Sequence, residues 1–427
     1  MPRRTVWVCF PGAEYTQRVA EKAAKHVLEP AGWQVNATSE APADGADGAP
    51  DADAYLADYD YLPFERIFER NALCSSYMIR KALIRKHYLA QALATYAVKK
   101  GTDAVVAPAT WTLDCQFADE LDEILADDLY EVKELLDENE ALIEQGHAPK
   151  HWLILKPGMA DQGHGIQLFS TEDRLREIFT DMEMSDDEDD QDEANDDASG
   201  VVASQLRHFV VQKYIHDPLL IRTNGTPRKF HLRAYVLCVG GLAVYLMDDM
   251  LALFATDAYS PPSGDGADMR GHLTNTCVGV RAAGSAPLPA ENVFRLSDLE
   301  GQPIEGGVLT KEHIKSIHSA AVRVVGTAFE AAARTAAVHW QLWPNAFELF
   351  GVDLLVSGGP APADLGVWLL EINAQPDYAQ SGERLERVIE HVFERALQVS
   401  MLDQRIDTLG ASVDGCTLCF SDRLYAK

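Results

Sequence analysis

In some segments of this chain the apolar residues recur with the period of a strand, and in others with the period of a helix. The apolar run Thr5–Phe10 predicts a strand, and Ala13–Leu28 carries apolar residues at helical spacing. Further strands are predicted at Gly32–Val35, His151–Lys156, Gly165–Phe169, Phe209–Val211, Phe230–Val239, Ala243–Met247, Phe347–Val356 and Val367–Ile372. Helices are predicted over most of Phe64–Lys100, Asp119–Gln145, Asp173–Phe179, Lys311–His339 and Arg384–Leu397. No repeat of roughly 20–50 residues organises these elements.

Three polar segments interrupt this pattern. Ala41–Asp53 and Ser260–Gly271 are rich in Pro, Gly and Asp, which predicts loops. Residues 183–197 contain ten acidic and no basic side chains. Because such a segment buries too little apolar surface to offset the entropy of ordering, we expect a disordered acidic insertion at 183–200 that acts as a solvated spacer.

Length and composition predict a soluble protein of two or three lobes. The chain has 427 residues, 47% of them hydrophobic and 24% charged, as in globular proteins. It has no apolar run of the ~20 residues that cross a bilayer, and its N-terminus lacks the core of a signal peptide. Seven scattered cysteines suit a reducing compartment, and Cys416 and Cys419 lack the second pair of a zinc site. We therefore expect a cytoplasmic protein without membrane contact.

The net charge of −29 argues against nucleic-acid binding through bulk electrostatics. Acidic substrates are also repelled unless a local basic surface overrides this field. Such a surface is predicted in Ser76–Ala90, which contains Arg80, Lys81, Arg85 and Lys86. A solvated helix face is the ordinary interpretation of this cluster, and a positive surface beside a nucleotide site is the alternative.

Polar residues in two apolar C-terminal strands predict a metal site. Glu371 and Asn373 are two residues apart in a strand, so they project from the same face. A carboxylate among apolar neighbours is costly to bury unless a charge compensates it, and Asp353 interrupts its own strand in the same way. Carboxylate and amide oxygens suit Mg²⁺. Capped or salt-bridged strand ends fit these residues equally well.

The segment around Lys156 has the residue types of a phosphate site. Lys156 ends a strand and precedes a loop that contains Gly158, Gly163 and Gly165. Backbone amides of such a loop can approach phosphates closely, while the lysine supplies a point charge. A hairpin turn without a ligand has the same composition, and taken alone it is the favoured interpretation.

A basic strand offers a second anion site. Lys229, His231 and Arg233 alternate with apolar residues, so they share one face of the strand. They would repel one another unless they meet anions such as phosphates, or unless the face is exposed to solvent. Two weaker signals are Val210–Ile215, which could present backbone groups to an adenine edge, and the segment His272–Cys277, which offers polar contacts or structural hydrogen bonds.

The order of these segments resembles the tubulin–tyrosine ligase family. The matching series runs from about Asn71 to Gly382 and reads ILKP…GHGI, VVQKYI, RKFHLRAYVL, HLTNTC, FELFGVDLLV and WLLEINAQP. The resemblance implies an α+β, ATP-grasp fold, in which two lobes clamp ATP. The lobes would be 71–227 and 228–427, preceded by a small N-terminal α/β lobe at 1–70.

The resemblance also implies a role for each matched residue. The phosphates of ATP would be contacted by Lys156 and by the loop that contains Gly163 and Gly165. The adenine pocket would be lined by Gln212, Lys213, Tyr214 and Ile215. Further contacts to the nucleotide would come from Lys229, His231, Thr274 and Asn275. The transferred phosphoryl group would be neutralised by Arg233 and Lys229. Magnesium would be held by Asp353, Glu371 and Asn373, and one lysine of the basic helix, Lys81 or Lys86, would face the site.

The implied activity is carboxylate–amine ligation. ATP phosphorylates a carboxylate, and an amine then displaces phosphate to form an amide. The acceptor would be a protein or peptide, such as a tubulin tail. Two residues depart from the family's pattern: His231 stands where Asp is usual, and Leu253 where an arginine near the substrate is usual. The ATP site therefore matches the family more closely than the tubulin-tail site does.

Other sequence segments suggest a different partner. The segments IRKALIRKHYL, RKFHLRAYVL and DMLALFA are similar to a fungal branch of the family. In that branch an ATP-grasp domain occurs in a P-body protein associated with mRNA decapping. The alternative hypothesis is thus an ATP-binding interaction module of a complex of mRNA-decapping proteins, with little or no ligase activity. A third hypothesis is a metabolic ligase for small molecules, which a deep closed pocket would favour.

Overall fold

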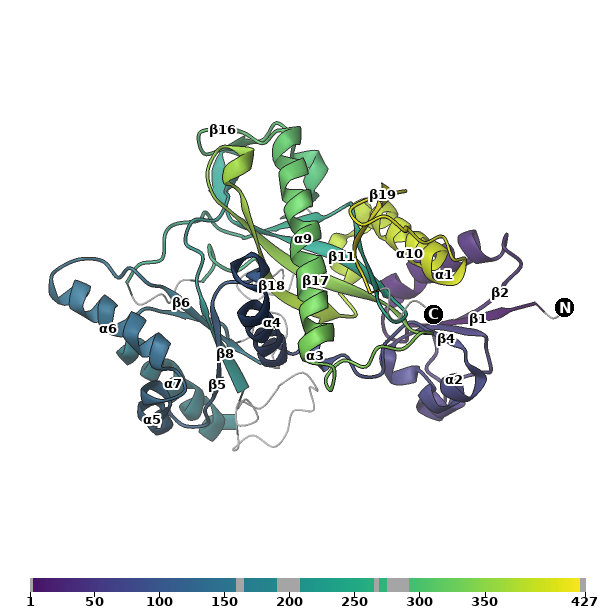
Figure 1. Ribbon diagram of the computed structural model, residues 1–427, viewed down its shortest axis with the longest axis horizontal. Coiled ribbons are helices and arrows are strands. Elements are labelled where there is room, and N and C mark those ends of the chain that lie inside the picture. The colour runs from purple at the N-terminus through teal and green to yellow at the C-terminus, as the bar shows by residue number, and fades with distance from the viewer. Residues whose placement is uncertain (1–2, 159–164, 190–207, 265–268, 275–291, 423–427) are drawn as a thin grey trace.

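The computed structural model describes residues 3–158, 165–189, 208–264, 269–274 and 292–422. Within these residues, three regions lie side by side, as Figure 1 shows. The N-terminal sheet is at one end, a large sheet crossed by a long helix is in the middle, and a helix-covered sheet is at the other end. None of the helices in the described residues combines the length and the apolar composition of a membrane span.

The N-terminal region is a parallel sheet in the order β2-β1-β3-β4. Along β1, Val6 and Val8 pack in the apolar cluster that contains helix α1, whereas Trp7 and Cys9 pack in the cluster that contains Ile67 of α2. Both faces of this strand are covered, which explains its continuous apolar sequence. The elements are β1 (Thr5–Cys9), α1 (Glu14–Leu28), β2 (Gln34–Thr38), β3 (Ala54–Ala57), α2 (Phe64–Arg70) and β4 (Leu73–Cys74).

The region at the far end is an antiparallel sheet in the order β5-β8-β6-β7, with helices on one face. Leu155 and Val211 point into the core beneath those helices. Because side chains alternate along a strand, their neighbours Lys156 and Gln212 face the opposite side. The elements are β5 (Thr110–Asp114), α5 (Leu121–Ala126), α6 (Tyr130–Glu144), β6 (Leu153–Pro157), β7 (Gln167–Phe169), α7 (Glu172–Asp189) and β8 (His208–Lys213).

The middle region is an antiparallel sheet centred on β11. Strands β13 and β12 pair with successive halves of one edge of β11, β17 pairs with its other edge, and β18 pairs with β17. The strands are β11 (Phe230–Val239), β12 (Ala243–Met247), β13 (Leu251–Phe254), β14 (Val293–Arg295), β17 (Phe347–Ser357), β18 (Gly366–Ala374), β19 (Ser412–Val413) and β20 (Cys416–Ser421). A small adjoining sheet consists of β9 (Ile221–Thr223), β10 (Thr226–Arg228), β15 (Pro303–Ile304) and β16 (Gly307–Val308).

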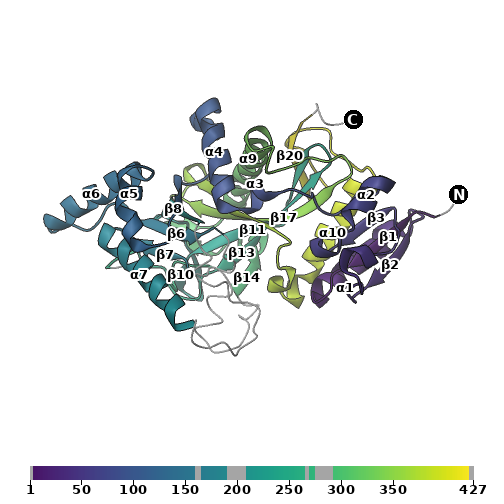
Figure 2. The same ribbon diagram turned by 90° about the horizontal axis from the view of Figure 1, so that it is seen from below.

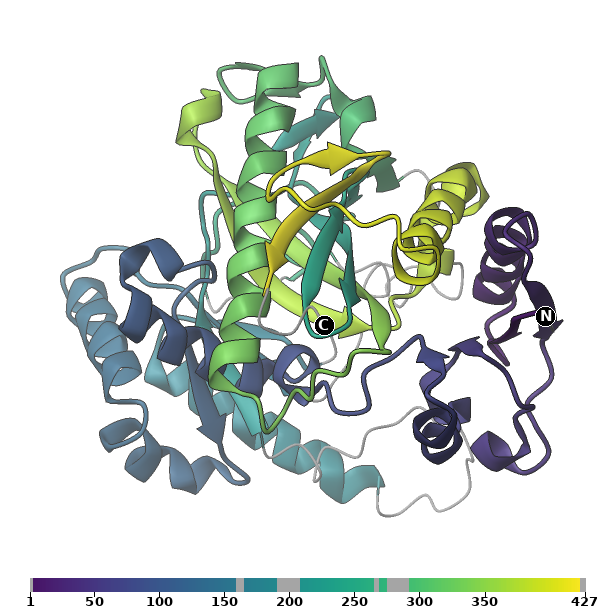
Figure 3. The same cartoon turned by 45° about the vertical axis from the view of Figure 1, so that its right-hand side comes forward.

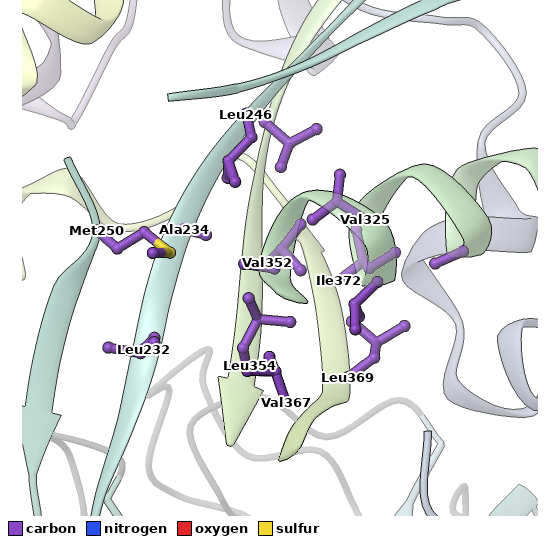
Figure 4. Close-up of a cluster of buried hydrophobic side chains, with 14 of the residues drawn as sticks. Leu232, Ala234, Leu246, Met250, Val325, Val352, Leu354, Val367, Leu369 and Ile372 are labelled. Carbon is purple, nitrogen blue, oxygen red and sulfur yellow. The ribbon is translucent and has the colours of Figure 1, made fainter. Parts of the chain in front are cut away.

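Helices cover this middle sheet on both faces. The long helix α9 (Lys311–Thr335) crosses one face, as Figure 3 shows, and α10 (Glu386–Met401) lies on the other. Figure 4 shows Val325 of α9 close to Val352 of β17 and Ile372 of β18, all fully or almost fully buried. Two shorter helices, α3 (Lys81–Ile84) and α4 (Lys86–Lys100), precede β5. The strands β11, β17 and β18, packed between these helices, carry several of the predicted site residues.

The N-terminal region is attached to the middle region through α1 and α10, which lie beside each other in Figures 1 and 3. Arg18 pairs with Glu386 at 2.7 Å, and His26 pairs with Glu394 at 2.8 Å. Each exposed pair of this kind contributes at most about 1 kcal/mol. The shared apolar cluster of α1, α10 and β11 therefore supplies most of the attachment.

Most predicted elements are present, with corrections at their ends. The strands Phe230–Val239 and Ala243–Met247 are confirmed at the predicted residues. The predicted helix Lys311–His339 ends at Thr335, and Asp119–Gln145 is broken into α5 and α6. Disorder was predicted from residue 183, but α7 continues through Asp189, and residues 190–200 lie outside the described residues. Helix α7 therefore includes the first part of the acidic segment.

Candidate functional site

Two adjoining cavities of about 620 and 690 Å³ lie between the β5–β8 sheet and the middle sheet. Figure 2 shows β6 and β8 next to β11 and β17. Lys156, Gln212 and Glu371 line both cavities, so we treat them as one site and call it the central cavity. The predicted residues that it brings together come from segments almost 290 residues apart, from Lys86 to Asn373.

One wall of the central cavity is the open face of β6 and β8. Lys156 Nζ donates a hydrogen bond to Gln212 Oε1 at 2.8 Å, and Gln212 Nε2 donates to Thr110 Oγ1 at 2.9 Å. Thr110 belongs to β5, a strand that the sequence pattern did not predict. The three residues form a polar chain across neighbouring strands, which fixes the position of the Lys156 ammonium group.

A second lysine lies on the opposite wall. Lys229 Nζ donates to the Tyr214 hydroxyl at 2.9 Å and lies 4.5 Å from the centre of that ring. The Tyr214 hydroxyl also forms a 2.9 Å hydrogen bond with His272 Nδ1. His231 and Thr274 lie nearby, joined by a 2.6 Å hydrogen bond. His272 was only part of a weak motif, and its contact with Tyr214 had no sequence signal.

Both lysines are buried. Among the described residues, neither Lys156 nor Lys229 forms a salt bridge. Burial lowers the pKa of Lys156 to about 8, and burial together with the charge of Lys156 lowers the pKa of Lys229 to about 7. Burial also lowers the pKa of His231. A bound anion would stabilise the protonated forms of these groups and offset the cost of burying their charge. The wall is therefore suited to phosphate.

Arg233, Asp353 and Glu371 form a row across three strands. Asp353 is the cross-strand neighbour of Arg233 on one side and of Glu371 on the other. Arg233 donates through Nε to Asp353 Oδ1 at 2.6 Å and through Nη2 to Asp353 Oδ2 at 3.2 Å. This bidentate pair is of the strong kind. Cross-strand pairing, rather than proximity in sequence, therefore builds the row.

Lys86 and Asn373 complete the surroundings of Glu371. Lys86 Nζ lies 3.3 Å from Glu371 Oε2, and Asn373 Nδ2 lies 3.3 Å from Glu371 Oε1 and 3.4 Å from Asp353 Oδ2. Burial alone would raise the pKa of Glu371, but the charges of Lys86 and Lys156 outweigh it and hold that pKa well below its ordinary value. Glu371 is thus a carboxylate at every physiological pH.

The donor set fits magnesium. Two carboxylates and one amide meet at the end of the cavity, and Mg²⁺ uses one or two carboxylates together with substrate phosphates. Within the described residues no group of three His, Cys, Asp or Glu side chains could hold a metal by itself. The salt-bridged alternative is also realised, because Arg233 and Lys86 neutralise Asp353 and Glu371.

The structure separates the members of the basic segment Ser76–Ala90. Arg80 is buried and pairs with Glu348 at 2.8 Å, away from the central cavity. Lys81 is exposed, and Lys86 lies against Glu371. The segment is therefore not one solvated helix face: it turns at Arg85, between α3 and α4, and directs Lys86 inward.

The remaining predicted residues have different outcomes. Ile215 and Thr274 line the cavity, and Lys213 lies at its exposed rim. Gly165 has a φ of +69°, and a Cβ there would lie 2.9 Å from Pro157, so only glycine fits this turn. Gly163 and Asn275 lie outside the described residues. The exposed-face alternative for the basic strand is wrong, since Lys229 and His231 are buried and Arg233 is bound to Asp353.

Leu253 lies on β13 opposite His231. It is 3% exposed and packs in the apolar cluster shared with α1 and α10. It therefore supplies no cation to the cavity.

Comparison with known proteins gives consistent matches to one family. The family model described as "Tubulin-tyrosine ligase family" matches residues 72–408. A protein of Schizosaccharomyces pombe, described as a probable tubulin–tyrosine ligase, is 38% identical over 83% of this chain and 84% of its own length. The probable tubulin–tyrosine ligase PBY1 of Saccharomyces cerevisiae is 36% identical over 80% of this chain, but over only 44% of its own length.

A solved structure covers the chain in three dimensions. It is the C-terminal domain of Pby1 from K. lactis, described as an ATP-grasp enzyme that interacts with the mRNA decapping enzyme Dcp2. The TM-score is 0.66 at 26% identity, and the match covers 99% of this chain and 100% of that one. The family model spans well over half of the sequence, and the solved structure has the predicted architecture. The chain belongs to the tubulin–tyrosine ligase family and has an α+β, ATP-grasp fold.

Proposed function

We propose that this protein is an ATP- and Mg²⁺-dependent ligase that adds an amino acid to a carboxylate of a protein or peptide. One observation carries the proposal: Lys156 and Lys229 are buried beside the row Arg233–Asp353–Glu371, and neither forms a salt bridge with a carboxylate of the described residues. Unpaired buried cations call for an anionic ligand, and the acids next to them supply oxygens for a metal that such a ligand would share.

The nucleotide would lie along the central cavity. Its base would lie between Ile154, Ile166 and Leu355, which line the cavity together with Tyr214. The amides of Lys213 and Tyr214 already donate to Ala109 and Trp152, so the amide of Ile215 is the donor that we assign to the adenine edge. The phosphates would then meet Lys156 and Lys229, with Asp353, Glu371 and Asn373 as the residues that hold magnesium. Magnesium bound there would neutralise phosphate charge.

The chemistry follows from this placement. The acceptor carboxylate attacks the γ-phosphorus, the bond to the β-phosphate oxygen breaks, and ADP leaves. The amine of the donor then attacks the acyl-phosphate carbon, phosphate leaves, and the amine gives up a proton as the amide forms. Positioning and charge neutralisation are the protein's contribution. Arg233, which is bound to Asp353 on the neighbouring strand, would bind the transferred phosphoryl group once that group competes with Asp353 for its guanidinium.

The acceptor is defined less closely than the nucleotide. Leu253 leaves no cation where the family's tubulin ligases usually have one, and the net charge of −29 repels acidic tails. This favours a second candidate function, an ATP-binding module that docks on mRNA-decapping proteins in the cytoplasm. The K. lactis structure supports it because that protein interacts with Dcp2. Pull-down from cell extract tests this candidate, and recovery of no decapping factor would contradict it.

The ligase proposal is tested with ATP, Mg²⁺, a panel of amino acids and a panel of acidic peptides. Peptide mass spectrometry reports the added residue, and ADP formation reports turnover. We expect a mass increase on one peptide that requires ATP, Mg²⁺ and one amino acid together. ATP binding without ADP formation for any acceptor would exclude ligase activity on these substrates and favour the docking module.

A further inference from the structure

A separate cavity of about 940 Å³ lies where the N-terminal sheet meets the middle sheet. It is bounded by the ends of β1 and β3, the first turn of α1, the start of β17 and the segment after β18. We call it the junction cavity. Among the described residues, none lines both the junction cavity and the central cavity. Part of this space is open to solvent, and the volume to compare with the roughly 300–1,000 Å³ of small-molecule sites is about 280 Å³.

The topology marks this place as a ligand site. From β1 the chain passes through α1 to β2 on one side of β1, and β3 then pairs on the other side. The carboxyl ends of β1 and β3 thus flank a point at which the strand order reverses, and open parallel sheets bind ligands in the crevice at such a point. Phe10 and Asp58, the residues that directly follow these two strands, both line the junction cavity.

The residues that line the junction cavity determine which charge a bound ligand can carry. The apolar part of this lining includes the rings of Phe10, Phe347 and Tyr378. Within the described part of the chain, the charged residues of this lining are all acidic. Glu348 is neutralised by Arg80 at 2.8 Å, which leaves Asp58 and Asp377 as the charges that face a ligand.

Asp58 and Asp377 each have an oxygen to offer. Asp58 Oδ1 accepts the amide of Asp60, and Asp377 Oδ1 accepts the amide of Ala379, both at 3.0 Å. These turn hydrogen bonds use only one oxygen of each carboxylate. An anionic ligand would be repelled, whereas an ammonium group on an apolar body would satisfy both the acids and the rings.

We propose that the junction cavity binds a small primary amine with an apolar body, its ammonium group held by Asp58 and Asp377. The site is distinct from the nucleotide site and requires neither ATP nor ligase activity. A ligand there would contact the N-terminal and middle sheets at once, and would therefore stabilise their attachment.

Calorimetric titration of the full chain without ATP tests this proposal. The probes are 2-phenylethylamine and 3-phenylpropionate, which share a ring and a chain and differ in the sign of their charge. The amine is expected to bind, and the carboxylate is not. Asp58→Asn/Asp377→Asn keeps the side-chain oxygens that accept the two amides but removes both charges, and we expect it to weaken amine binding by about tenfold or more.

The matched control is Glu65→Gln/Glu69→Gln, which makes the same change of charge at exposed positions of α2. It is expected to bind the amine like the native chain. Unchanged thermal midpoints would show that both double variants are folded. Equal binding of the two probes, no binding of the amine, or equal affinities of the two double variants would each overturn the proposal. Because no ATP is present, these outcomes are independent of whether the protein is a ligase.

Discussion

Nucleotide binding should take up protons from solution near pH 8. In the free protein the pKa of Lys156 is about 8 and that of Lys229 is about 7. At pH 8 Lys156 is then half protonated and Lys229 about one-tenth protonated, as the two pKa values require. Bound phosphates favour both charged forms and raise both pKa values toward that of an ordinary lysine. Binding should therefore take up roughly half a proton at Lys156 and about nine-tenths of one at Lys229.

The sign of the pH dependence follows. Both groups have the lower pKa in the free protein, so affinity is highest below pH 7 and falls as pH rises through the two free-state values. Through Lys156 alone the association constant should fall about tenfold between pH 7 and pH 9. The uptake itself is measured by calorimetric titration with Mg·ATP at pH 8 in buffers of different ionisation enthalpy, and it should approach zero at pH 6.

A substitution distinguishes the contributions of the two lysines to proton uptake. Lys229→Met should bind Mg·ATP more weakly and take up only the roughly half a proton due to Lys156 at pH 8. The refuting results are native binding without proton uptake at pH 8, or an affinity that increases from pH 7 to pH 9. Either would mean that the phosphates do not lie against these two ammonium groups.

Three further predictions concern the row of charges. Lys86→Ala should weaken Mg·ATP binding about tenfold, because Lys86 lines the cavity and its charge would attract the phosphates, whereas Lys81→Ala at an exposed position should change it little; equal losses in the two titrations would contradict the assignment of Lys86. Glu371→Gln should lower Mg²⁺-dependent ADP formation by roughly a hundredfold or more while the thermal midpoint stays high, and native turnover would refute the metal assignment. Arg233→Met should lower the free energy of unfolding by about 3–5 kcal/mol in urea titration, since it leaves the buried Asp353 carboxylate without its bidentate partner; a loss below about 1 kcal/mol would show that Asp353 is compensated in another way.

The sequence predicted the site residues better than it predicted how they meet. Glu371 and Asn373 were placed on one strand face by their spacing alone, and the structure brings Asn373 within hydrogen-bonding distance of the Glu371 carboxylate. The row from Arg233 through Asp353 to Glu371 depends on the register of β11, β17 and β18. Arg233 and Asp353 are 120 residues apart, and local periodicity does not determine the register of strands that distant in sequence, so the pattern could not predict this row.

The basic segment Ser76–Ala90 shows a second limit of prediction from the sequence. Arg80, Lys81 and Lys86 are equivalent by composition and by charge. Their different positions follow from the turn at Arg85 and from the buried partner Glu348, which lies more than 250 residues further along the chain. Thr110 was missed for a related reason: β5 is short, and its polar residues resemble a loop until it pairs with β8.

The measurement that tests the central claim most directly is trapping of the acyl-phosphate. Hydroxylamine replaces the amino acid in a reaction with ATP, Mg²⁺ and a panel of acidic peptides, and attacks the acyl-phosphate carbon to give a peptide hydroxamate that mass spectrometry detects. The account predicts a hydroxamate that requires ATP and Mg²⁺ and is absent with Glu371→Gln. ADP formation without any hydroxamate, or equal hydroxamate from native chain and Glu371→Gln, would contradict it.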